Sequence, residues 1–565
     1  MSSTGNAILG CYVELVPNSQ HLQTNVHSAL YGSRLTFITH RFWSTAPNQH
    51  RIMFMTTSTM PFFVLPTDLV IQHVVRLPLP IVEGNKDYRE HEELLRRMDE
   101  LLDLSGVEQD FLASQVSEAR RTSDDPTKPL TERLRACIQR HARQTLRCTV
   151  ARILSSESHR VFSRHLAESA LLQWFCGIRF DGVIRVPSKS SLQRMEASVP
   201  TELIQELQSR LLLRSTQVDE HGQSALKLAD PIDLSMIWMD ATCAKLDIHY
   251  PCDWLLLRDA TRTIMKAIIT IRAHGLRHRM QAPERFIAMM NAQCMAMSGS
   301  SRRGRGSDKK RNRKRVLRTM KRIVKKVKEH GQRYRDLLEQ SWSTTDLTQR
   351  QAECIIQRID SVLEQLPDAI KQAHERIIGE RPVPNDKKVL NIYQPHAKVY
   401  VRGKAGADAE FGLQLLVCES AEGLIVDSHI VDGIINDSAL LMPAIERMRD
   451  SYGDKVAKVV VTDRGFSSLK NDAALDQAGI INATLPRNPA DLQALLEDPA
   501  MRQLQQRRAQ TEARIGIFKG KFLGDQLPTK NLEAQIRFVA WATLAHNLWV
   551  LARRKAVAQP LAVAG

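Results

Sequence analysis

The segments LSMIWMD (residues 234–240) and VAKVVVTD (residues 456–463) decide the fold. Each is a short apolar run that ends in an aspartate, which is the pattern of a buried strand. Three further strand-length runs, at 397–404, 410–420 and 423–431, are separated by turns that contain glycine. Helical segments are expected at 438–450 and 496–520, with a short strand at 481–486 between them. This order predicts an α/β (α+β) fold, a mixed sheet with helices packed on it.

Three acidic residues stand at informative places in this order. Asp240 is predicted to end the first core strand, Asp463 the fourth, and Glu512 to lie on the helix after the fifth. Neighbouring strand ends meet at one edge of a sheet, and a helix packed across it can bring a third carboxylate. Mg²⁺ prefers such oxygen ligands, and two ions about 4 Å apart assist phosphodiester cleavage. The three residues are therefore the predicted catalytic and metal-binding set.

The helix that carries Glu512 also carries two cations in regular spacing. Arg508 precedes Glu512 by four residues and Lys519 follows it by seven. At about 100° per residue the three fall within roughly 40° on a helical wheel. A surface ion-pair face explains this spacing equally simply. The two strand-end aspartates favour a functional face.

A dense basic segment lies at 301–335. It contains 17 Lys or Arg and two acids, and it supplies +15 of the chain's formal net charge of +17. A stripe of one sign indicates a polyanion partner, most commonly nucleic acid. The candidate DNA contacts are Arg311, Arg313, Lys314, Arg315, Lys321, Arg322, Lys325 and Lys326. A solvated helix or a disordered arm is the simpler alternative, and a membrane-surface helix is disfavoured because Trp and Phe are absent.

The remaining pattern divides the chain. Residues 1–84 form a poorly defined N-terminal extension, and 85–225 are helical and predicted to bind DNA, with a helix-turn-helix or an ordinary bundle as open readings. The catalytic core is expected at 226–260 and 390–555, with a basic helical insertion at 261–389 between the first and second core strands. Residues 298–307 are predicted to be a flexible loop. Nine dispersed cysteines without a CxxC pair favour reduced thiols and no zinc site, and no apolar run is long enough for a bilayer.

Several motifs together resemble DDE-type bacterial insertion-sequence transposases, whose catalytic domain has an RNase H-like fold. They are MDATCAKLDIHYPCDWLLLRDATR from Met239, RGKAGADAEFG from Arg402, VVVTDRGFSS from Val459, the R-x3-E-x6-K signature of Arg508, Glu512 and Lys519, and WATLAHNLWVLARR from Trp541. Segment 166–196 is similar to the helical N-terminal domain of the same elements.

The resemblance implies a DNA transposase that cleaves element ends and transfers strands into target DNA. It implies two Mg²⁺ ions, with Mn²⁺ as a substitute, held by Asp240, Asp463 and Glu512, and backbone contacts from Arg508 and Lys519. The implied partners are double-stranded DNA, as terminal inverted repeats and target, and a second copy of the chain on paired ends. No membrane partner is implied, and the implied location is the bacterial cytoplasm, at the nucleoid.

Two features depart from the family pattern. Gln505 occupies the position where relatives often place a tyrosine able to stack on a displaced base, which puts a hairpin route of cleavage in doubt. The extra helical material follows Asp240, whereas many relatives insert it before the Glu helix.

Nearby polar residues have simpler roles. His249, Asp253 and Asp259 are expected to form a turn and helix start; support of Asp240 by their side chains is the alternative. Arg464 with Gly465 is expected to shape the turn after Asp463. His396 is expected to be structural. The rival functions are an RNase H-like nuclease without strand transfer and a catalytically silent DNA-binding relic. A nucleotide-driven motor is disfavoured because no G-x4-GK-[ST] loop occurs.

Overall fold

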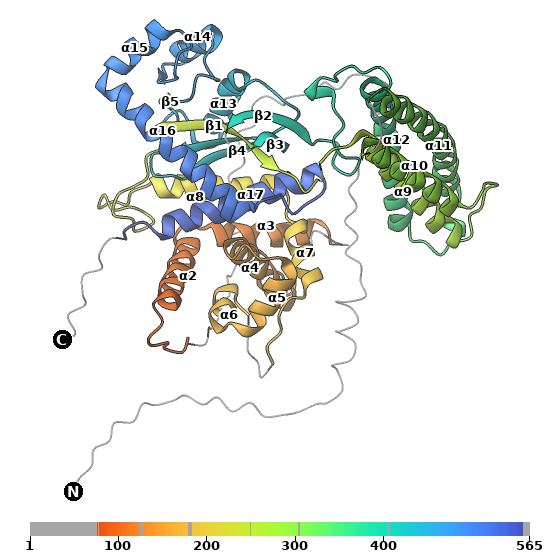
Figure 1. Cartoon of the computed structure of the whole chain (residues 1–565). Coiled ribbons are helices and arrows are strands. Elements are labelled where there is room, and N and C mark those ends of the chain that lie inside the picture. The colour runs from red at the N-terminus through yellow and green to blue at the C-terminus, as the bar shows by residue number, and fades with distance from the viewer. Residues whose placement is uncertain are drawn as a thin grey trace, which may run out of the picture. The chain divides into compact units, whose positions relative to one another are not determined.

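Residues between 236 and 482 contribute a six-stranded mixed sheet (Figure 1). The computed structural model describes residues 76–556, apart from 77, 124, 126–128, 179–182, 249, 303–305 and 405–406. The strands are β1 (Met236–Lys245), β2 (Lys398–Lys404), β3 (Ala407–Ser420), β4 (Ile425–Val431), β5 (Val459–Val461) and β6 (Ile481–Asn482). Their order is β2-β3-β1-β5-β6, with β4 also paired to β3. The predicted mixed α/β class is confirmed.

Strand β1 is central and longer than the sequence pattern predicted. It pairs antiparallel with β3 from Ile237 to Lys245 and parallel with β5 from Met236 to Trp238. Asp240 therefore lies in the middle of β1, and the prediction that it ends the strand was wrong. The physical reason is the length of β3, whose backbone continues the ladder for five residues past Asp240. A polar residue within a ladder does not interrupt it, since only backbone groups pair.

Helices cover both faces of the sheet. Asp240 pairs with Val417, and Val417 pairs with Ser428, so these side chains share one face. Ser428 hydrogen-bonds Thr543 of α17 (Leu532–Ala552), which places α17 on the Asp240 face. On the opposite face, Asp427 forms an ion pair with a residue of α13 (Leu441–Tyr452). Asp240 is thus on the side that α17 covers.

The N-terminal helices share their hydrophobic core with the sheet. They are α2 (Lys86–Leu104), α3 (Val107–Arg121), α4 (Glu132–Leu154), α5 (His159–Glu168), α6 (Ala170–Cys176), α7 (Lys189–Ser198) and α8 (Thr201–Thr216). Their apolar residues join those of β1, β3 and α17 in one cluster. Helices α5 and α6 are separated by Ser169 alone, whose hydroxyl caps α6 by accepting from the Leu172 amide at 3.2 Å. No helix in the described ranges has the length and apolarity needed to cross a membrane.

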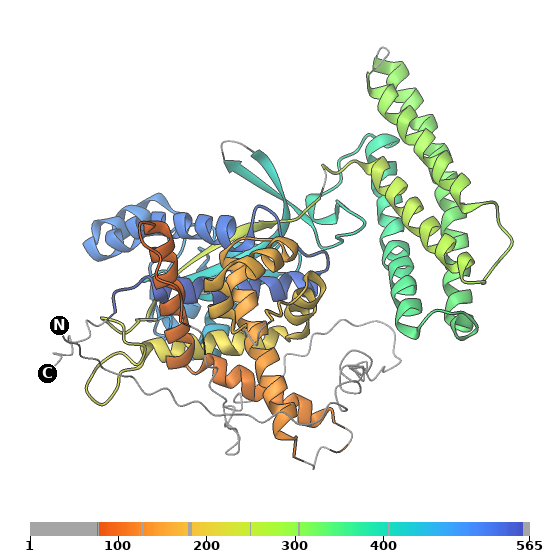
Figure 2. The ribbon, with the colours of Figure 1, turned by 90° about the horizontal axis from the view of Figure 1, so that it is seen from below.

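Between β1 and β2 the chain forms a four-helix bundle with a core of its own. Its helices are α9 (Asp253–Ala273), α10 (Pro283–Arg302), α11 (Gly306–Ser341) and α12 (Gln349–Ile377) (Figure 2). Leu256 and Leu257 of α9 belong to its core, so the bundle begins before residue 261, where the sequence placed its start. The predicted loop at 298–307 was wrong for 298–302 and 306–307, which are helical. An established helix extends one hydrogen bond at a time, so small polar residues can continue it.

Helix α17 buries an uncharged histidine. His546 is 3% exposed and lies edge-on to Phe518 and Phe522, with ring centroids at 5.5 and 5.1 Å. Burial lowers the pKa of His546 from 6.5 to about 4. The protonated ring is therefore favoured in the unfolded chain over the folded one throughout this interval.

This burial predicts acid sensitivity. Since the folded pKa lies below the unfolded value, stability falls as the pH decreases from 6.5 towards about 4, by about 3 kcal/mol for this group. Thermal unfolding midpoints of the wild type and of His546→Phe, measured across pH 4–8, would test this. The difference between the two proteins should change sharply only below pH 6.5. Parallel curves over the whole range would show that His546 does not contribute.

Candidate functional site

The parallel pairing of β1 and β5 places the two aspartates on neighbouring strand segments. Trp238 pairs with Val461, and each aspartate follows its member of this pair by two residues. Neighbouring strands lie about 4.8 Å apart, and residues two apart point to the same face. Both aspartates are partly exposed, whereas Trp238 and Val461 are buried. Asp240 therefore lies within β1, and Asp463 lies in the turn that directly follows the neighbouring strand β5.

A tight turn holds Asp463. Its Oδ1 accepts from the Gly465 amide at 2.8 Å, and its backbone carbonyl accepts from the Phe466 amide at 3.3 Å. The Phe466 side chain is fully buried, which fixes this end of the turn to the hydrophobic core. An aspartate that bonds the backbone two residues on forms an Asx-turn, which restricts its side chain. Arg464 and Gly465 shape this turn in the expected way, and both backbone carbonyls accept from Arg487.

The Glu helix is shorter than predicted. The segment 496–520 is two α-helices, α15 (Pro489–Glu497) and α16 (Pro499–Ile517), followed by a π-helical turn, η4 (Phe518–Leu523). Asp498 divides α15 from α16, because its side chain caps α16 by accepting from the Ala500 amide at 2.8 Å. Pro499 at the first helical position is compatible with that start.

Helix α16 lies across the Asp240 face of the sheet. Its Met501 and Leu504 pack on the buried group Trp238, Val461 and Ala483. The Trp238 indole donates to the Leu504 carbonyl at 3.1 Å. Further along, Lys519 of η4 donates to the Thr242 hydroxyl at 3.1 Å. These two contacts, at Trp238 and at Thr242, lie two residues before and two residues after Asp240 in β1.

Glu512 lies on α16 between those two contacts. Its side chain is 49% exposed and pairs with Arg508 at 3.5 Å. Arg508 and Glu512 share the predicted face, since their side chains pair. Lys519 lies just beyond the end of α16, on the π-helical turn. The Lys519 ammonium group donates to the hydroxyl of Thr242 in β1, which lies on the same face of the sheet as Asp240.

Gln505 has a structural task. Its side-chain amide donates to the Thr462 carbonyl at 3.3 Å and to the Ala483 carbonyl. These bonds tie α16 to the ends of β5 and β6. A side chain held on two backbone carbonyls does not offer a surface for a displaced base, which agrees with the departure noted at this position.

The donor chemistry fits a divalent cation in part. Asp240 and Asp463 offer carboxylate oxygens on neighbouring strand segments, the ligand type that Mg²⁺ prefers. Within the described residues, no three His, Cys, Asp or Glu side chains converge closely enough to hold a metal ion. Glu512 is turned towards Arg508 in this conformation. Completing a three-carboxylate site would therefore need a rotamer change of Glu512, for which its half-exposed position leaves room.

Sequence reasoning missed a fourth carboxylate. A Cβ placed on Gly465 would lie 2.9 Å from Asp463 Oδ1 and 3.1 Å from Asp437 Oδ2. Asp437 begins a short 3-10 turn before α13, and its Oδ1 accepts from Gln414 at 3.1 Å. Gly465 thus leaves open the gap between two carboxylates. No local motif marks Asp437, since its position depends on the turn that follows β4.

That gap predicts a functional role for the missing side chain at Gly465. In Gly465→Ala the new methyl would meet the Asp463 carboxylate at 2.9 Å and push it aside. Displacing a reacting group by about 1 Å costs roughly 100-fold in rate, so an activity that uses the Asp463 carboxylate, assayed as metal-dependent cutting of DNA, should fall by about that factor.

The matched control is Gly516→Ala on α16, where nothing lies within 4 Å of the added Cβ. Replacing a helical glycine in this way should stabilise by about 0.5–1 kcal/mol and leave cutting unchanged. Cutting rates and unfolding midpoints of both variants would be compared. Equal cutting rates in the two variants would contradict the prediction that activity depends on the position of the Asp463 carboxylate.

The structure separates the predicted cations of α11 into two groups. Lys314 pairs with Glu380 at 2.8 Å, Lys321 contacts His374 at 3.3 Å, and Arg313 lies over the Trp254 ring at 5.5 Å. These three side chains contact other parts of the bundle. The remaining five are exposed, and they are Arg311, Arg315, Arg322, Lys325 and Lys326.

Other candidates have structural partners. Asp253 is 5% exposed and accepts from Gln372 and Arg376 of α12, at 2.9 and 2.8 Å. It fastens α9 to α12, which agrees with the favoured structural reading. Asp259 is also buried in the bundle, and His396 lies 3.7 Å from Asp432. His249 and most of residues 1–84 lie outside the described residues.

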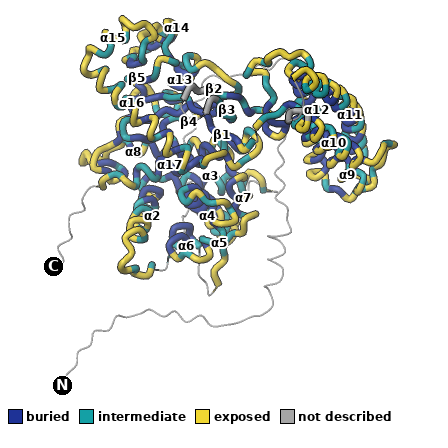
Figure 3. Tube along the Cα trace, in the orientation of Figure 1, coloured by how far each residue is buried: buried dark blue, intermediate teal, exposed yellow. Residues whose placement is uncertain are grey.

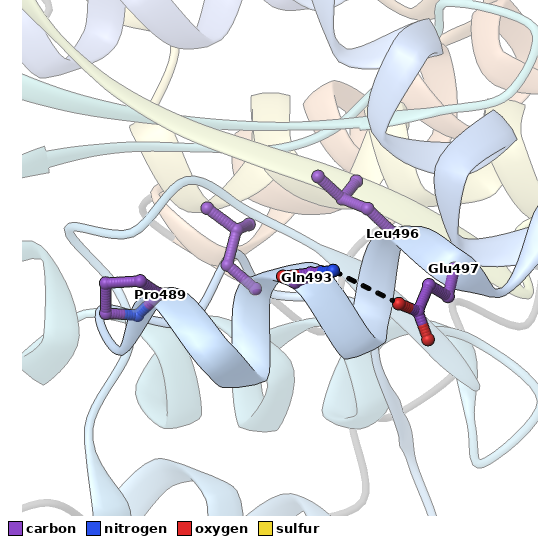
Figure 4. Close-up of a pocket in the computed structure, with 5 residues that line it drawn as sticks. Pro489, Gln493, Leu496 and Glu497 are labelled. Carbon is purple, nitrogen blue, oxygen red and sulfur yellow. Dashed lines mark hydrogen bonds between the residues drawn. The ribbon is translucent and has the colours of Figure 1, made fainter.

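A surface hollow lies along α15, away from the carboxylates. It is lined by Pro489, Leu492, Gln493, Leu496 and Glu497 (Figure 4). A hydrogen bond of 3.4 Å from Gln493 to Glu497 crosses it. None of the predicted site residues contributes to this hollow.

Comparison with known proteins found no matching family model, curated protein or solved structure.

Proposed function

We propose that the chain is a DDE-type DNA transposase with an RNase H-like catalytic core. The observation that carries the proposal is the parallel pairing of Trp238 with Val461, two residues before Asp240 and Asp463, under the helix that bears Glu512. The resemblance of the surrounding motifs supplies the reaction class. The sheet supports the fold assignment, because long antiparallel strands precede a helix and a parallel strand on the other edge of β1.

The proposed reaction has two steps with the same chemistry at phosphorus. In the first, a water oxygen attacks a phosphodiester at the element end, and the 3′ oxygen leaves as a hydroxyl. In the second, that 3′ oxygen attacks a target phosphodiester, and a target 3′ oxygen leaves in its place. Each step forms one P–O bond and breaks one, so neither needs an energy source.

The residues of the chain divide this work. Asp240, Asp463 and Glu512 would hold two divalent ions, and these ions supply charge stabilisation at the scissile phosphate and an acidified water. Lys519, fixed by its bond to Thr242, presents its ammonium group beside the same face and would contact a backbone phosphate. Arg508 would exchange its carboxylate partner for phosphate when Glu512 turns to the metal.

The proposal also names partners and a location. Double-stranded DNA is the substrate, both as terminal inverted repeats and as target, and the site of action is the bacterial nucleoid. Joining two ends requires them to be held together, so a homodimer on paired ends is proposed. Gel filtration with end DNA that gives one protomer per end, with no bridged species, would contradict the dimer.

The helical region 85–225 is proposed to bind DNA through α7. Its outward residues include Lys189, Ser190, Gln193 and Arg194, which are exposed. Its inward Glu196 is held by Arg152 at 2.7 Å and by His159 at 2.9 Å. A helix pinned on one side and polar on the other suits a groove reader.

One assay tests the function. The purified chain would be mixed with a linear DNA that carries the element's own ends and with a supercoiled target, in Mg²⁺ or EDTA. Metal-dependent cutting at the ends with joined products is the expected result. Cutting without joining would favour the RNase H-like nuclease. Binding without cutting would favour a silent relic and would contradict the proposal.

A further inference from the structure

The bundle α9–α12 is held together by its own apolar core, separate from the core of the sheet. Residues from all four helices contribute, including Ile264, Met290, Leu317 and Ile359, each at most 2% exposed. Helix α11 runs the length of the bundle and presents both buried and exposed residues along it (Figures 2 and 3). The outer side of α11 is therefore a surface on a rigid support.

The exposed cations of α11 form one stripe. Arg311, Arg315, Arg318, Arg322, Lys325 and Lys326, named here the α11 stripe, are all exposed. At about 100° per residue they fall within an arc of roughly 100°. The buried residues of the same stretch, among them Val316, Met320 and Val327, are centred on the opposite side. The stripe is thus the face most distant from the bundle core.

No acid neutralises this stripe. Within the described residues, none of its six cations forms an ion pair. The contrast lies on the same helix, where Lys310 and Lys314 share Glu380. These two lysines lower the pKa of the Glu380 carboxyl to about 2, with the Lys310 hydrogen bond as the largest cause. The chain therefore pairs the cations at the end of α11 and leaves those of the stripe to solvent.

The spacing of the stripe suits a phosphate backbone. From Arg311 to Lys326 the helix extends about 22 Å at 1.5 Å per residue. Phosphates follow one strand of B-DNA at about 3.4 Å along its axis, so the stripe matches a span of roughly six. No aromatic side chain stands among the six cations, and phosphate contact without base stacking carries no sequence information. A lipid surface fits less well, because the apolar side of α11 is used in the bundle core.

We infer that the inserted bundle is a sequence-independent binding module for duplex DNA, which contacts the backbone through the α11 stripe and acts separately from the carboxylate site. The choice of DNA over other polyanions rests on the proposed function. The module would hold DNA of any sequence, as flanking or target DNA requires, while element ends are recognised elsewhere in the chain.

The test compares two triple variants of the full chain. The stripe variant is Arg318→Gln, Arg322→Gln and Lys325→Gln. The matched control is Arg350→Gln, Arg358→Gln and Lys371→Gln, three exposed cations of α12 in the same bundle. Both lose three charges, and glutamine is a comparable helix former. Binding to a random-sequence duplex without element ends would be measured in EDTA across a range of NaCl concentrations.

The stripe variant should bind at least roughly tenfold more weakly, and its slope of log affinity against log salt should be smaller by about 2–3, since each lost phosphate contact removes about 0.9. The control should keep the wild-type slope. An unchanged slope in the stripe variant, or equal losses in both variants, would overturn the inference. Tighter binding to anionic vesicles or to duplex RNA than to duplex DNA would overturn the assignment of the partner.

The outcome is independent of the cutting assay. A protein that binds random duplex through the stripe but never cuts element ends would contradict the proposed function and keep the inference. A protein that cuts and joins DNA, but whose slope of log affinity against log salt is the same in the stripe variant, would support the proposed function and contradict the inference.

Discussion

Replacing Asp463 with asparagine should reduce metal-dependent cutting by about 10³-fold or more and leave DNA binding intact. The amide keeps the shape of the side chain and its acceptor for the Gly465 amide, but it removes the negative charge that would hold a metal ion. Metal ions contribute several kcal/mol of charge stabilisation at phosphorus, and about 4 kcal/mol corresponds to 10³-fold in rate. Asp240→Asn is expected to cause a similar loss of cutting, because both carboxylates are proposed ligands of the same metal ions.

Glu512→Gln is the decisive member of this series. In the structure Glu512 is half-exposed and paired with Arg508, an arrangement that by itself is worth less than about 1 kcal/mol. A metal ligand at this position predicts loss of cutting as severe as for the aspartates. A surface ion pair predicts full activity.

The measurement is single-turnover cutting of end DNA in Mg²⁺ and in Mn²⁺, together with binding of the same DNA in EDTA. Asp476→Asn on α14 (Leu469–Gln477) is the matched control, since Asp476 is exposed and belongs to the next helix after Asp463. Full activity in Asp463→Asn would refute the carboxylate site. Loss of DNA binding in the same variant would mean that the substitution disturbs the fold.

Glu419→Ala should lower the free energy of unfolding of the sheet region by about 3–5 kcal/mol, the usual effect of removing one partner of a buried ion pair. Glu419 is 2% exposed, and its Oε1 accepts from Arg507 at 2.8 Å and from Thr511 at 2.7 Å. Arg507 also lies 3.8 Å from the Trp238 ring centre and donates to the backbone carbonyls of Ser420, the last residue of β3, and Ala421. This group fastens α16 to β1 and β3 on the Asp240 face.

Loss of Glu419 would leave the Arg507 guanidinium, which is 15% exposed, without its carboxylate. Helix α16 would then lose a main attachment, and Glu512 would lose its place above Asp240. Hydrogen exchange of the α16 amides would report this locally, beside the shift in the denaturant midpoint followed by tryptophan fluorescence. Faster exchange is expected in 499–517 and not in the bundle helices.

Two controls frame this result. Glu533→Ala breaks a surface pair with Arg537, in which Glu533 is 80% exposed, and should cost less than about 1 kcal/mol. Thr511→Val removes one hydrogen bond to Glu419, should cost about 1 kcal/mol, and should leave the chain folded for the cutting assay. If Glu419→Ala were no more destabilising than Glu533→Ala, the buried group would not be what holds α16.

The amino-acid sequence by itself determined the mixed α/β class, the positions of the strand segments and the residue types that could bind a metal. These follow from local pattern, because apolar runs of strand length and acids at their ends need no knowledge of distant partners. The same pattern identified the basic segment, but it could not separate Lys314 and Arg313, which contact Glu380 and Trp254, from Arg322, which faces solvent.

Only the tertiary structure decided how these pieces meet. The register of β1 against β5, the extension of β1 past Asp240, the inward turn of Gln505 and the approach of Asp437 to Gly465 all depend on residues far apart in the chain. A strand's period shows which side is apolar, but its pairing is chosen by the packing of its partners. Likewise, helix period places Arg508 with Glu512, whereas the contact of Lys519 with Thr242 depends on a π-helical turn that packs against α17.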